Sequence, residues 1–523
     1  MVMKMRNKEK SVYSVILATY GEFFRNMNSK WLIMVGLSLL PSLISPLKVY
    51  LEKFLFDSAE QIYINGSISE DIKWILPSLL CLQIIFICCY AVYRSSINYI
   101  GSDLEILLQN NLNAKTARLH MRAFEHQQTY KNIELAASAS RELRFMVMMF
   151  TSELFVYLVT FVTISGVLTS YHYSLIIMGG LAVIPDICTK VIQANYQYKK
   201  MDYMQELTRS KEYFEKILAY SEFQKEVRVY GTSSFFLKKW IDRREKWCQE
   251  KRKVISRNLV IRLICEGINC ITAFASIFLV IALLLHKAIS VGEFASALSA
   301  VLLLKTNFMR ILSLGLFSFQ CGLNGRYYYS VFDYEERTGK EEDISPEGGI
   351  ELDHVSFAYD DGKKVLEDVC FTIQPGQTIA IVGANGAGKS TFSKMILGLY
   401  EPEEGIVWYS GKNVAEYAES FVFRHLSAVF QDYCRYYFTV QENICIGNPE
   451  NLDMDFMAQL MEKLQIQIRN KTTKKQQLSV KLGVEFGGEE LSGGTWQKIA
   501  IARGLYKNHK FIPESVKLTV PAH

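Results

Sequence analysis

The sequence lacks the cysteine and histidine spacings that mark metal-binding or disulfide-linked domains. Its 11 cysteines include no C-x-x-C pair and no cluster with histidine, so the spacing predicts no metal site. Several lie in apolar runs, where cysteine behaves as a small hydrophobic residue, and we expect reduced thiols. A cleavable signal peptide is not expected either, because the first strongly apolar run has spanning length and no small-residue cleavage site.

The sequence also has only a small excess of positive over negative charge. The formal net charge is +5 over 523 residues, which does not point to nucleic acid as a partner. The basic residues are concentrated in particular loops, and their placement matters more than their total. A chain of this length is too long for one hydrophobic core, so we expect at least two domains.

Long apolar runs, in contrast, are abundant in the first two thirds of the chain. Six runs have about the ~20 residues that a helix needs to cross a bilayer. We place these spans at 31–51, 74–93, 145–168, 172–192, 259–285 and 294–316. A mixed segment before them, from about Glu9 to Arg25, predicts an amphipathic helix at the membrane surface. Residues 1–335 are thus predicted to form an all-α transmembrane domain.

The basic residues predict the orientation of these spans. The loop 54–72 is acidic and has no Lys or Arg, whereas the long connections 94–144 and 193–258 are rich in both. The basic connections are expected inside, so an even number of spans leaves both termini in the cytoplasm. Their composition favours helical extensions into the cytoplasm, one with its tip near 229–234, over solvated linkers.

Ionisable residues within the spans are candidates for a function, because a Lys or Arg at the bilayer centre costs about 2.5–3.5 kcal/mol. Lys305 is the most central and is our candidate for lining a cavity. Arg310 also lies within a span. For Asp186 and Glu266 we favour a location near the inner interface.

The stretch from Gly383 to Thr391 matches G-x-x-x-x-G-K-[ST], between a β-rich run at 378–382 and a helical pattern from Phe392. Glycines let consecutive N–H groups wrap a phosphate, and the start of the helix offers its positive end. The residues predicted to bind ATP here are Gly383, Ala384, Asn385, Gly386, Ala387, Gly388, Lys389, Ser390 and Thr391. Lys389 can reach the β- and γ-phosphates, and the Ser390 hydroxyl can ligate Mg²⁺. The alternative is a tight turn before a core helix.

The C-terminal third reads as an α/β domain. We predict a linker at 336–348 and a domain at 349–523, with strands at 350–359, 369–373, 378–382, 405–409 and 426–430. A second helix start suited to an anion lies near the end of the chain. There Ser492 is a plausible N-cap, and Gly493 and Gly494 permit close approach.

Together, the six spans, the P-loop and Leu491-Ser-Gly-Gly494 resemble an ATP-binding cassette (ABC) half-transporter of the exporter kind, over nearly the whole chain. The resemblance implies a six-helix transmembrane domain followed by an α/β nucleotide-binding domain, in the plasma membrane. It implies ATP-driven export of a peptide, lipid or drug-like substrate, with Mg²⁺. It also implies a homodimer, or a heterodimer with another half-transporter, in which ATP lies between one P-loop and Ser492, Gly493 and Gly494 of the other subunit.

Two more residues take roles from this resemblance. Tyr359 matches the aromatic residue that stacks on adenine, and Gln431 matches the Q-loop glutamine that touches Mg²⁺ and senses the γ-phosphate. The segment from Lys225 to Gly231 matches a coupling segment of the second cytoplasmic loop. Taken alone, Tyr359 and Gln431 would read as an ordinary strand aromatic and a polar loop residue.

The sequence departs from the family pattern near its end. Thr495 replaces the usual Gln, the following Trp496 is a hint of the branch exporting lantibiotic-like peptides, and Glu485–Gly488 lacks the usual Gly-Glu order. After Phe511 the family continues with an apolar strand ending in Asp-Glu, a D-loop and a switch histidine. In this sequence Pro513 interrupts the expected strand. Glu514 follows no apolar run, and His523 does not lie in the context of the switch histidine. We therefore expect no catalytic residue, a C-terminally truncated cassette, weak nucleotide binding and little hydrolysis.

Three hypotheses about the function follow from the sequence. The leading one is an exporter half-transporter, hydrolysis-deficient alone, so that whether the chain is an ATPase stays open. The second is a non-hydrolysing regulatory or structural membrane subunit that binds nucleotide in a heterodimer. The third is an inactive product that does not accumulate in cells.

Overall fold

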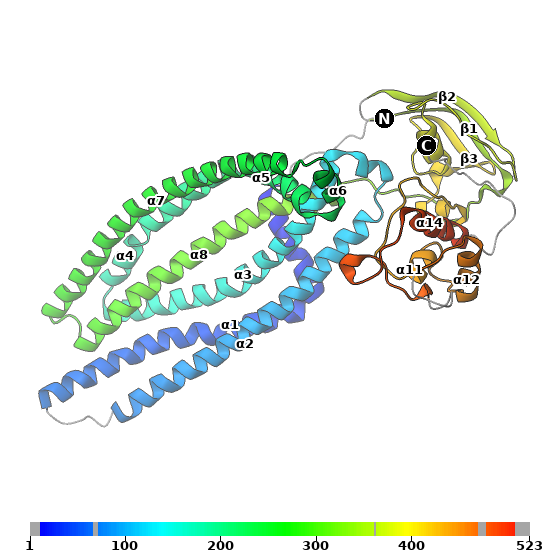
Figure 1. The fold of residues 1–523 in the computed structure, drawn as a ribbon. Coiled ribbons are helices and arrows are strands. Elements are labelled where there is room, and N and C mark those ends of the chain that lie inside the picture. The colour runs from blue at the N-terminus through cyan, green and yellow to red at the C-terminus, as the bar shows by residue number, and fades with distance from the viewer. Residues whose placement is uncertain (1–10, 66–71, 360–361, 469–476, 508–523) are drawn as a thin grey trace. The chain divides into compact units, whose positions relative to one another are not determined.

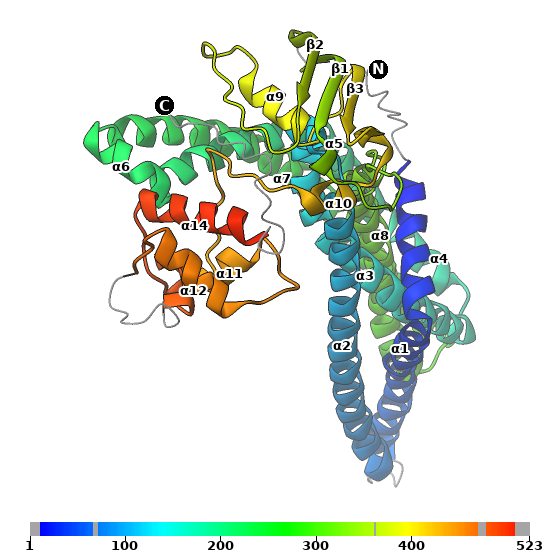
Figure 2. The same cartoon turned by 90° about the vertical axis from the view of Figure 1, so that its right-hand side faces the viewer.

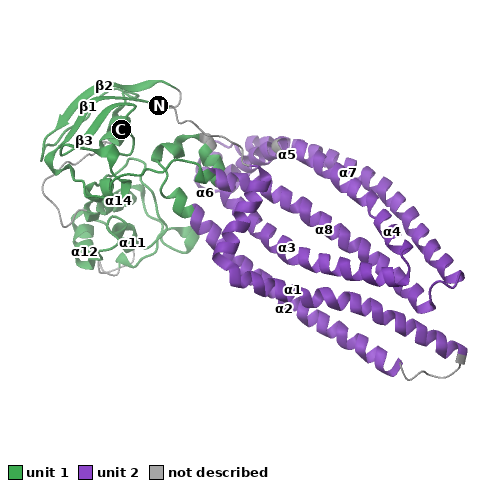
Figure 3. Cartoon of the chain, turned by 180° about the vertical axis from the view of Figure 1, so that it is seen from behind, with its two compact units in different colours: residues 1–7, 113–133, 331–523 green, residues 8–112, 134–330 purple. Residues whose placement is uncertain are grey.

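The computed structural model describes residues 11–65, 72–359, 362–468 and 477–507 (Figure 1). Pro513, Glu514 and His523 lie outside these residues, as does the rest of the expected irregular ending. The chain forms two compact units (Figure 3), unit 1 from residues 1–7, 113–133 and 331–523, and unit 2 from residues 8–112 and 134–330. The predicted domain boundary near 336 cuts the chain at one point. In the structure, unit 1 also includes residues 113–133, from between the second and third spans.

Unit 2 is built from long apolar helices (Figure 1), and six helical stretches are long and apolar enough to cross a membrane. The helices are α1 (Val12–Asn65), α2 (Ile72–Thr116), α3 (Gln127–Tyr171), α4 (Ser174–Leu181), α5 (Ile184–Ala219), α6 (Ser221–Val229), α7 (Ser233–Leu285) and α8 (Val291–Phe332). The fourth stretch contains both α4 and the start of α5. The backbone turns between them at Ala182 and Val183, just before Pro185, which has no N–H for the helix ladder.

The helices continue beyond the predicted spans, as the composition of the long connections indicated. Helices α2 and α5 extend well past the ends of their apolar runs, and α7 begins well before its own. The predicted tip lies between α6 and α7, where Gly231 has φ +63°. Glycine suits this left-handed conformation because it has no Cβ.

The segment predicted to form an amphipathic helix at the membrane surface is helical and has one buried face. It forms the first part of α1, which is interrupted by non-helical backbone at Met27. Its apolar face, with Val12, Val15 and Phe23, is buried within unit 2. The Tyr329 hydroxyl of α8 donates to Thr19 at 3.1 Å, so this face packs against protein. The opposite face, with Tyr13, remains exposed.

In unit 1, an antiparallel sheet has the strand order β2-β1-β3-β4. The strands are β1 (Ile350–Ala358), β2 (Lys364–Ile373), β3 (Glu404–Tyr409) and β4 (Lys412–Asn413). Figure 2 shows α9 (Lys389–Ile396) beside this sheet. Buried residues of the sheet and of α9 share one hydrophobic cluster, which includes Leu352, Phe357, Met395 and Tyr409.

A second cluster in unit 1 joins three helices, α11 (Val440–Cys445), α12 (Met454–Lys463) and α14 (Gly493–Lys507). The residues of α14 buried in this cluster are Trp496, Ile499, Ala502 and Tyr506. The capping box of α11 is complete, because Thr439 and Glu442 bond each other's backbone N–H groups.

Two strand predictions were wrong. Residues 378–382 and 426–430 are not strands, although those at 350–358, 369–373 and 405–409 are. The side chain of Val382 is 89% exposed. An extended segment becomes a strand only when a neighbour accepts and donates its ladder hydrogen bonds. No neighbour of this kind pairs with 378–382 among the described residues.

Candidate nucleotide-binding site

The loop from Gly383 to Gly388 leads directly into α9. Gly388 is the N-cap of the helix and has φ +81°, and Gly386 has φ +85°. A Cβ at Gly388 would lie 3.0 Å from the Val365 carbonyl oxygen, so both conformation and space require glycine. The side chains between the first and last loop glycines are exposed. The loop is therefore open to a ligand at the N-terminus of α9, where backbone N–H groups favour an anion.

Lys389 supplies the positive charge at this loop. Its ammonium group donates to the carbonyl oxygens of Gly383 and Ala384, at 2.8 and 2.9 Å. The side chain thus folds back over the loop that it follows. An anion held by the loop would meet this ammonium group, because its hydrogen bonds to the carbonyls leave its charge uncompensated. Ser390, the next residue, is exposed on the same first turn.

Tyr359 and Thr391 come together although they are far apart in the sequence. Their hydroxyl groups are 3.0 Å apart. The Tyr359 ring packs edge-on against Phe357 and Tyr400, with ring centroids 5.2 and 6.1 Å away. The structure therefore brings the predicted adenine-stacking residue next to the helix that follows the P-loop.

Gln431 lies in an exposed turn. No hydrogen bond in the described part of the chain joins it to the P-loop. The contacts within the described chain therefore do not place Gln431 at the P-loop, and its role toward Mg²⁺ and the γ-phosphate stays a prediction.

Ser492 caps α14 as predicted. Its hydroxyl oxygen accepts a hydrogen bond from the Thr495 amide at 3.2 Å, and the two hydroxyls are 2.9 Å apart. Gly493 and Gly494 are exposed, with open space where a Cβ would be. The P-loop helix and α14 are anchored in different hydrophobic clusters. The two glycine-bearing helix starts thus belong to separate parts of unit 1.

Trp496 is 3% exposed and packs in the cluster of α11, α12 and α14. In this position it is a core residue of the cassette. Its side chain is therefore not available for contact with a bound molecule.

Sequence reasoning missed the residues that join distant segments around the site. The turn η1 (Met121–Glu125) belongs to unit 1, and Glu125 accepts hydrogen bonds from Tyr400 and from Lys394 of α9. Burial, followed by the Glu125 carboxylate, raises the pKa of Tyr400. Tyr400 also packs on Tyr359, so η1 contacts both the P-loop helix and the support of the predicted adenine residue. Only the spatial arrangement reveals these contacts.

Arg503 of α14 is a second missed residue. Its guanidinium group donates to Asn443 of α11 and, at 3.4 Å, to the carbonyl oxygen of Cys434, three residues after Gln431. Burial lowers the pKa of Arg503. The residue therefore connects α14 with the segment that follows Gln431.

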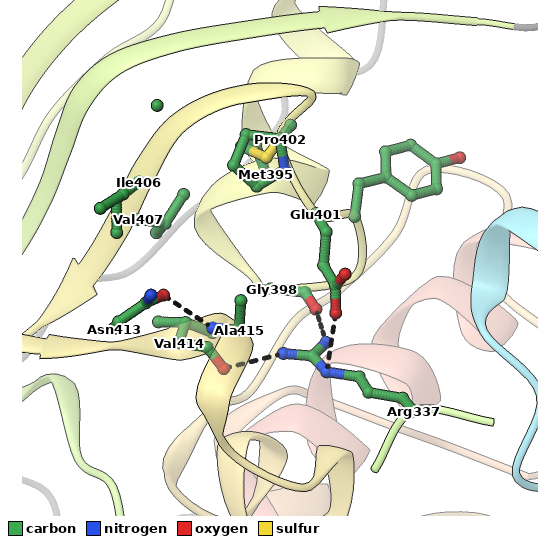
Figure 4. Close-up of a pocket in the computed structure, with 12 residues that line it drawn as sticks. Arg337, Met395, Gly398, Glu401, Pro402, Ile406, Val407, Asn413, Val414 and Ala415 are labelled. Atoms are coloured by element: carbon green, nitrogen blue, oxygen red, sulfur yellow. Dashed lines mark hydrogen bonds and ion pairs between the residues drawn. The ribbon is translucent and has the colours of Figure 1, made fainter. Parts of the chain in front are cut away.

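Arg337, in the linker before the sheet, lines a small pocket of about 120 Å³ (Figure 4). Its guanidinium group donates to the carbonyl oxygens of Gly398 and Val414 and lies 3.6 Å from the Glu401 carboxylate. The pocket is small and is partly filled by this side chain. Its role is structural, because it ties the linker to the C-terminal end of α9.

In unit 2, a polar cluster joins three of the spanning helices. Asp186 of α5 lies 3.3 Å from the Lys305 ammonium group of α8 and accepts a hydrogen bond from Asn269 of α7 at 2.9 Å. Asn269 is 6% exposed, and its Oδ1 has no hydrogen-bond partner among the described residues. Asp186, which we expected near the inner interface, is thus the counter-ion of Lys305. Glu266 instead pairs with Arg262 on its own helix, and both are exposed.

Comparisons with known proteins agree with this organisation. Residues 31–307, more than half of the chain, match the family described as ABC transporter transmembrane region. Residues 366–512 match the family described as ABC transporter. The solved structure of a bacterial Atm1-family ABC exporter with ATP bound superposes with a TM-score of 0.73, at 16% identity, covering 93% of this chain and 84% of that one. This similarity shows the fold.

Two relatives each align with about half of this chain, and the alignment spans about half of the relative. The subtilin transport ATP-binding protein of Bacillus subtilis is 28% identical over 301 residues, which are 56% of this chain and 49% of the relative. The ATP-dependent lipid A-core flippase of Coxiella burnetii is 29% identical over 306 residues, 55% of this chain and 48% of the relative. The chain thus spans about half the length of the curated relatives it matches.

Proposed function

Because the chain belongs to the ABC transporter family, we propose that it is one half of an ATP-driven exporter. The observation that carries the proposal is the combination of six spanning helices with a P-loop at the start of α9 and a glycine-bearing helix start at α14. The domains that we propose are 1–335 in the membrane, 336–348 as linker and 349–523 as the nucleotide-binding domain. Both termini are proposed to be cytoplasmic, on the side where ATP is available.

The P-loop residues fit a nucleotide phosphate. The loop is open, two of its glycines have positive φ, and Lys389 places a charge beside the N-terminus of α9. We propose that residues 383–391 hold the phosphates, that Tyr359 stacks on the base and that Ser390 and Gln431 ligate Mg²⁺. Bound ATP supplies the free energy for transport when its terminal phosphate is transferred to water.

We propose that the complete site forms between two chains. Ser492, Gly493 and Gly494 of one chain would face the P-loop of a second half-transporter, either another copy or a different chain. The exposure of the loop and of both α14 glycines supports this arrangement, since both surfaces are open to a second chain. Two helix N-termini facing one triphosphate would attract its charge from both sides.

We further propose that a polypeptide with the printed sequence binds ATP but hydrolyses it slowly. Its residues 508–523 contain no Asp-Glu pair after an apolar run, and they lie outside the described residues. Losing a general base typically costs 10²–10⁴-fold in rate. A heterodimer could still keep one competent site, if Ser492–Gly494 of this chain completed the P-loop site of a partner that has its own carboxylates.

For the substrate, we propose a peptide or a lipid-like molecule, the two classes suggested by the names of the relatives. Lys305, Asp186 and Asn269 are proposed to face the path of the substrate, because polar groups within spanning helices usually line such a path. The second candidate function is a nucleotide-binding subunit that regulates a partner without hydrolysis, and it rests on the lack of an Asp-Glu pair in residues 508–523.

The central experiment measures binding of a fluorescent ATP analogue to the purified full chain in detergent with Mg²⁺. Lys389→Ala is expected to raise the Kd at least tenfold, because it removes the charge beside the loop. The matched control is Lys412→Ala, an exposed lysine of the same unit, which should leave the Kd unchanged. Equal binding by the wild type and Lys389→Ala would overturn the proposed site.

Phosphate release by the same samples tests the proposal of slow hydrolysis. We expect a rate at least 10²-fold below that of a complete exporter measured in the same detergent. Ordinary turnover that Lys389→Ala abolishes would show that the carboxylates come from elsewhere. Transport by a heterodimer that survives Lys389→Ala would favour the regulatory alternative.

A further inference from the structure

Three chemically different donor groups gather on the surface of the sheet in unit 1, away from the loop that leads into α9. They are the carboxylate of Asp353, the imidazole of His354 and the thiol of Cys370, and their ligand atoms all lie within 4.8 Å of one another. All three residues are exposed, so a solute can reach them directly. The proposed nucleotide-binding function makes no use of them.

A β-bulge explains why these side chains meet. In the β1–β2 pairing, Leu352 lies opposite Phe371 and Val355 lies opposite Val369. Asp353 and His354 together therefore oppose Cys370 alone, and the extra residue interrupts the normal alternation of side chains. Both are exposed between the buried Leu352 and Val355, which places a carboxylate and an imidazole on the same face of the strand.

The bulge is held from both sides. His354 has φ +51°, an unusual conformation that its neighbours must maintain. On β3, a Cβ at Gly405 would lie 2.2 Å from the carbonyl oxygen of His354, and Gly405 itself has φ +85°. Only glycine fits at this position, so the strand can approach the bulge closely. The donor groups thus project from a firmly packed backbone, which is the support that a metal site needs.

Asp368 orients the histidine. Its Oδ1 lies 2.6 Å from Nδ1 of His354, so this nitrogen donates its hydrogen to the carboxylate. The lone pair of the neutral ring is then on Nε2, which lies 4.0 Å from Oδ1 of Asp353. A carboxylate that accepts from one ring nitrogen while the other binds a metal is the usual outer-shell arrangement of metal-bound histidine.

The distances and the ligand types suit zinc. Nitrogen and oxygen ligands about 2.0–2.1 Å from a tetrahedral zinc ion are roughly 3.4 Å apart, and a thiolate at about 2.3 Å lies slightly farther from them. Small rotations of the exposed side chains would therefore close the present gaps. A thiolate and an imidazole select borderline transition metals over Mg²⁺ or Ca²⁺, which prefer oxygen. Three protein ligands would leave the fourth position to water.

We propose that Asp353, His354 and Cys370 form a surface site for a divalent transition metal ion such as Zn²⁺, with Asp368 as a positioning residue. Cysteine and histidine spacing in the sequence gave no sign of it, because the ligands come from two strands and meet only through the bulge. The bound ion would bridge β1 and β2. It would therefore stabilise the sheet, since the unfolded chain does not hold the three groups together.

Titration of the purified, chelator-treated full chain with Co²⁺ tests the proposal, because tetrahedral Co²⁺ with a thiolate ligand has distinctive visible and near-ultraviolet absorption. The chain has 11 cysteines, so the informative quantity is the difference between variants. Both Cys370→Ser and His354→Asn should lose one equivalent of the thiolate–Co²⁺ signal. Asparagine is chosen at 354 because it tolerates positive φ. Asp368→Asn should weaken this equivalent about 10–100-fold without abolishing it.

The second measurement is the Tm of each variant with and without Zn²⁺. Zinc should raise the Tm of the wild type but not that of Cys370→Ser or His354→Asn, and the metal-free Tm of each variant reports whether it folds. Cys248→Ser, in unit 2, is the matched control and should titrate like the wild type. Identical Co²⁺ titrations for the wild type and Cys370→Ser would overturn the proposal, and so would an equal zinc-induced Tm shift in both.

Discussion

At the residue scale, the site depends on contacts that fix a few side chains at the start of α9. Lys389 bonds the loop carbonyls, and Tyr359 meets Thr391 while packing on Phe357. A hydroxyl contact and a ring contact thus hold the same tyrosine, and they are expected to matter differently for nucleotide binding. The hydroxyl acts on Thr391, whereas the ring face is the part that a base would stack on.

Two substitutions at Tyr359 separate these contributions. Tyr359→Phe removes one hydrogen bond, worth about 1 kcal/mol, and should change the affinity for an ATP analogue little. Tyr359→Ala removes the ring and should weaken binding by about 1–3 kcal/mol, the cost of losing base stacking on an aromatic residue. Isothermal titration calorimetry of both variants checks this. Inorganic triphosphate is the control ligand, and its affinity should be the same in all three proteins.

A pH dependence is expected at the capping box of α11. The Thr439 amide and hydroxyl bond the Glu442 carboxylate and hold its pKa below the ordinary value of 4.5. A lowered pKa in the folded state stabilises the fold above about pH 4.5, and this contribution is lost as the pH falls through the lowered value. Glu442→Gln keeps the cap geometry but cannot titrate. Urea midpoints from pH 6 to 3 should therefore fall less steeply for Glu442→Gln than for the wild type.

At the scale of elements, the same sequence pattern gives a strand in one place and unpaired chain in another. Strand β1 pairs with β2 on one side and β3 on the other, whereas residues 378–382 have no ladder partner in the described chain. Unpaired extended backbone with an exposed Val382 is a surface on which another strand can add. This surface lies immediately before the P-loop, so its pairing state affects how firmly the loop is held.

Hydrogen exchange of the full chain in detergent distinguishes the two segments. Amides of 378–382 should exchange within seconds, because no ladder hydrogen bond protects them, while those of 350–358 should exchange far more slowly. Peptides from both segments come from one digest and serve as mutual controls. Equal protection would mean that 378–382 is paired in solution.

At the scale of the whole molecule, both units are assembled from segments that are distant in the sequence. Unit 1 takes in residues 113–133 from between the second and third spans. There Lys115 lies 2.9 Å from Glu336 and lowers the pKa of this carboxyl group by hydrogen bonding. Unit 2 joins α5, α7 and α8 through the cluster of Asp186, Asn269 and Lys305. The first contact ties the end of α2 to the segment after α8, and the second ties together three helices that belong to different spans.

A double-mutant cycle measures the interaction between Asp186 and Lys305 in unit 2. Asp186→Asn and Lys305→Met should each destabilise the protein, because each leaves an uncompensated charge between spanning helices. The double variant should recover part of the loss, with a coupling of about 0.5–3 kcal/mol in detergent unfolding. Arg262→Gln and Glu266→Gln, an exposed pair on one helix, provide the matched cycle and should be nearly additive. Additive effects at Asp186 and Lys305 would mean that the two charges do not interact in solution.

Much of the architecture followed from local pattern. The six apolar runs, the helical extensions beyond them, three of the five predicted strands and the N-cap at Ser492 depend on residues within one or two turns of each other. The glycines and Lys389 of the P-loop were recognisable for the same reason. Their φ angles and the helix start are set by neighbours in the sequence.

The sequence alone thus determined the spanning helices, the loop that can hold phosphate and the family. Only the tertiary structure decided that Asp186 is the partner of Lys305, that Glu125 contacts Lys394 and Tyr400, and that Asp353, His354 and Cys370 share one face. Those contacts join residues separated by tens to hundreds of positions. Periodicity and spacing report on near neighbours along the chain, whereas such contacts depend on how whole elements pack against each other.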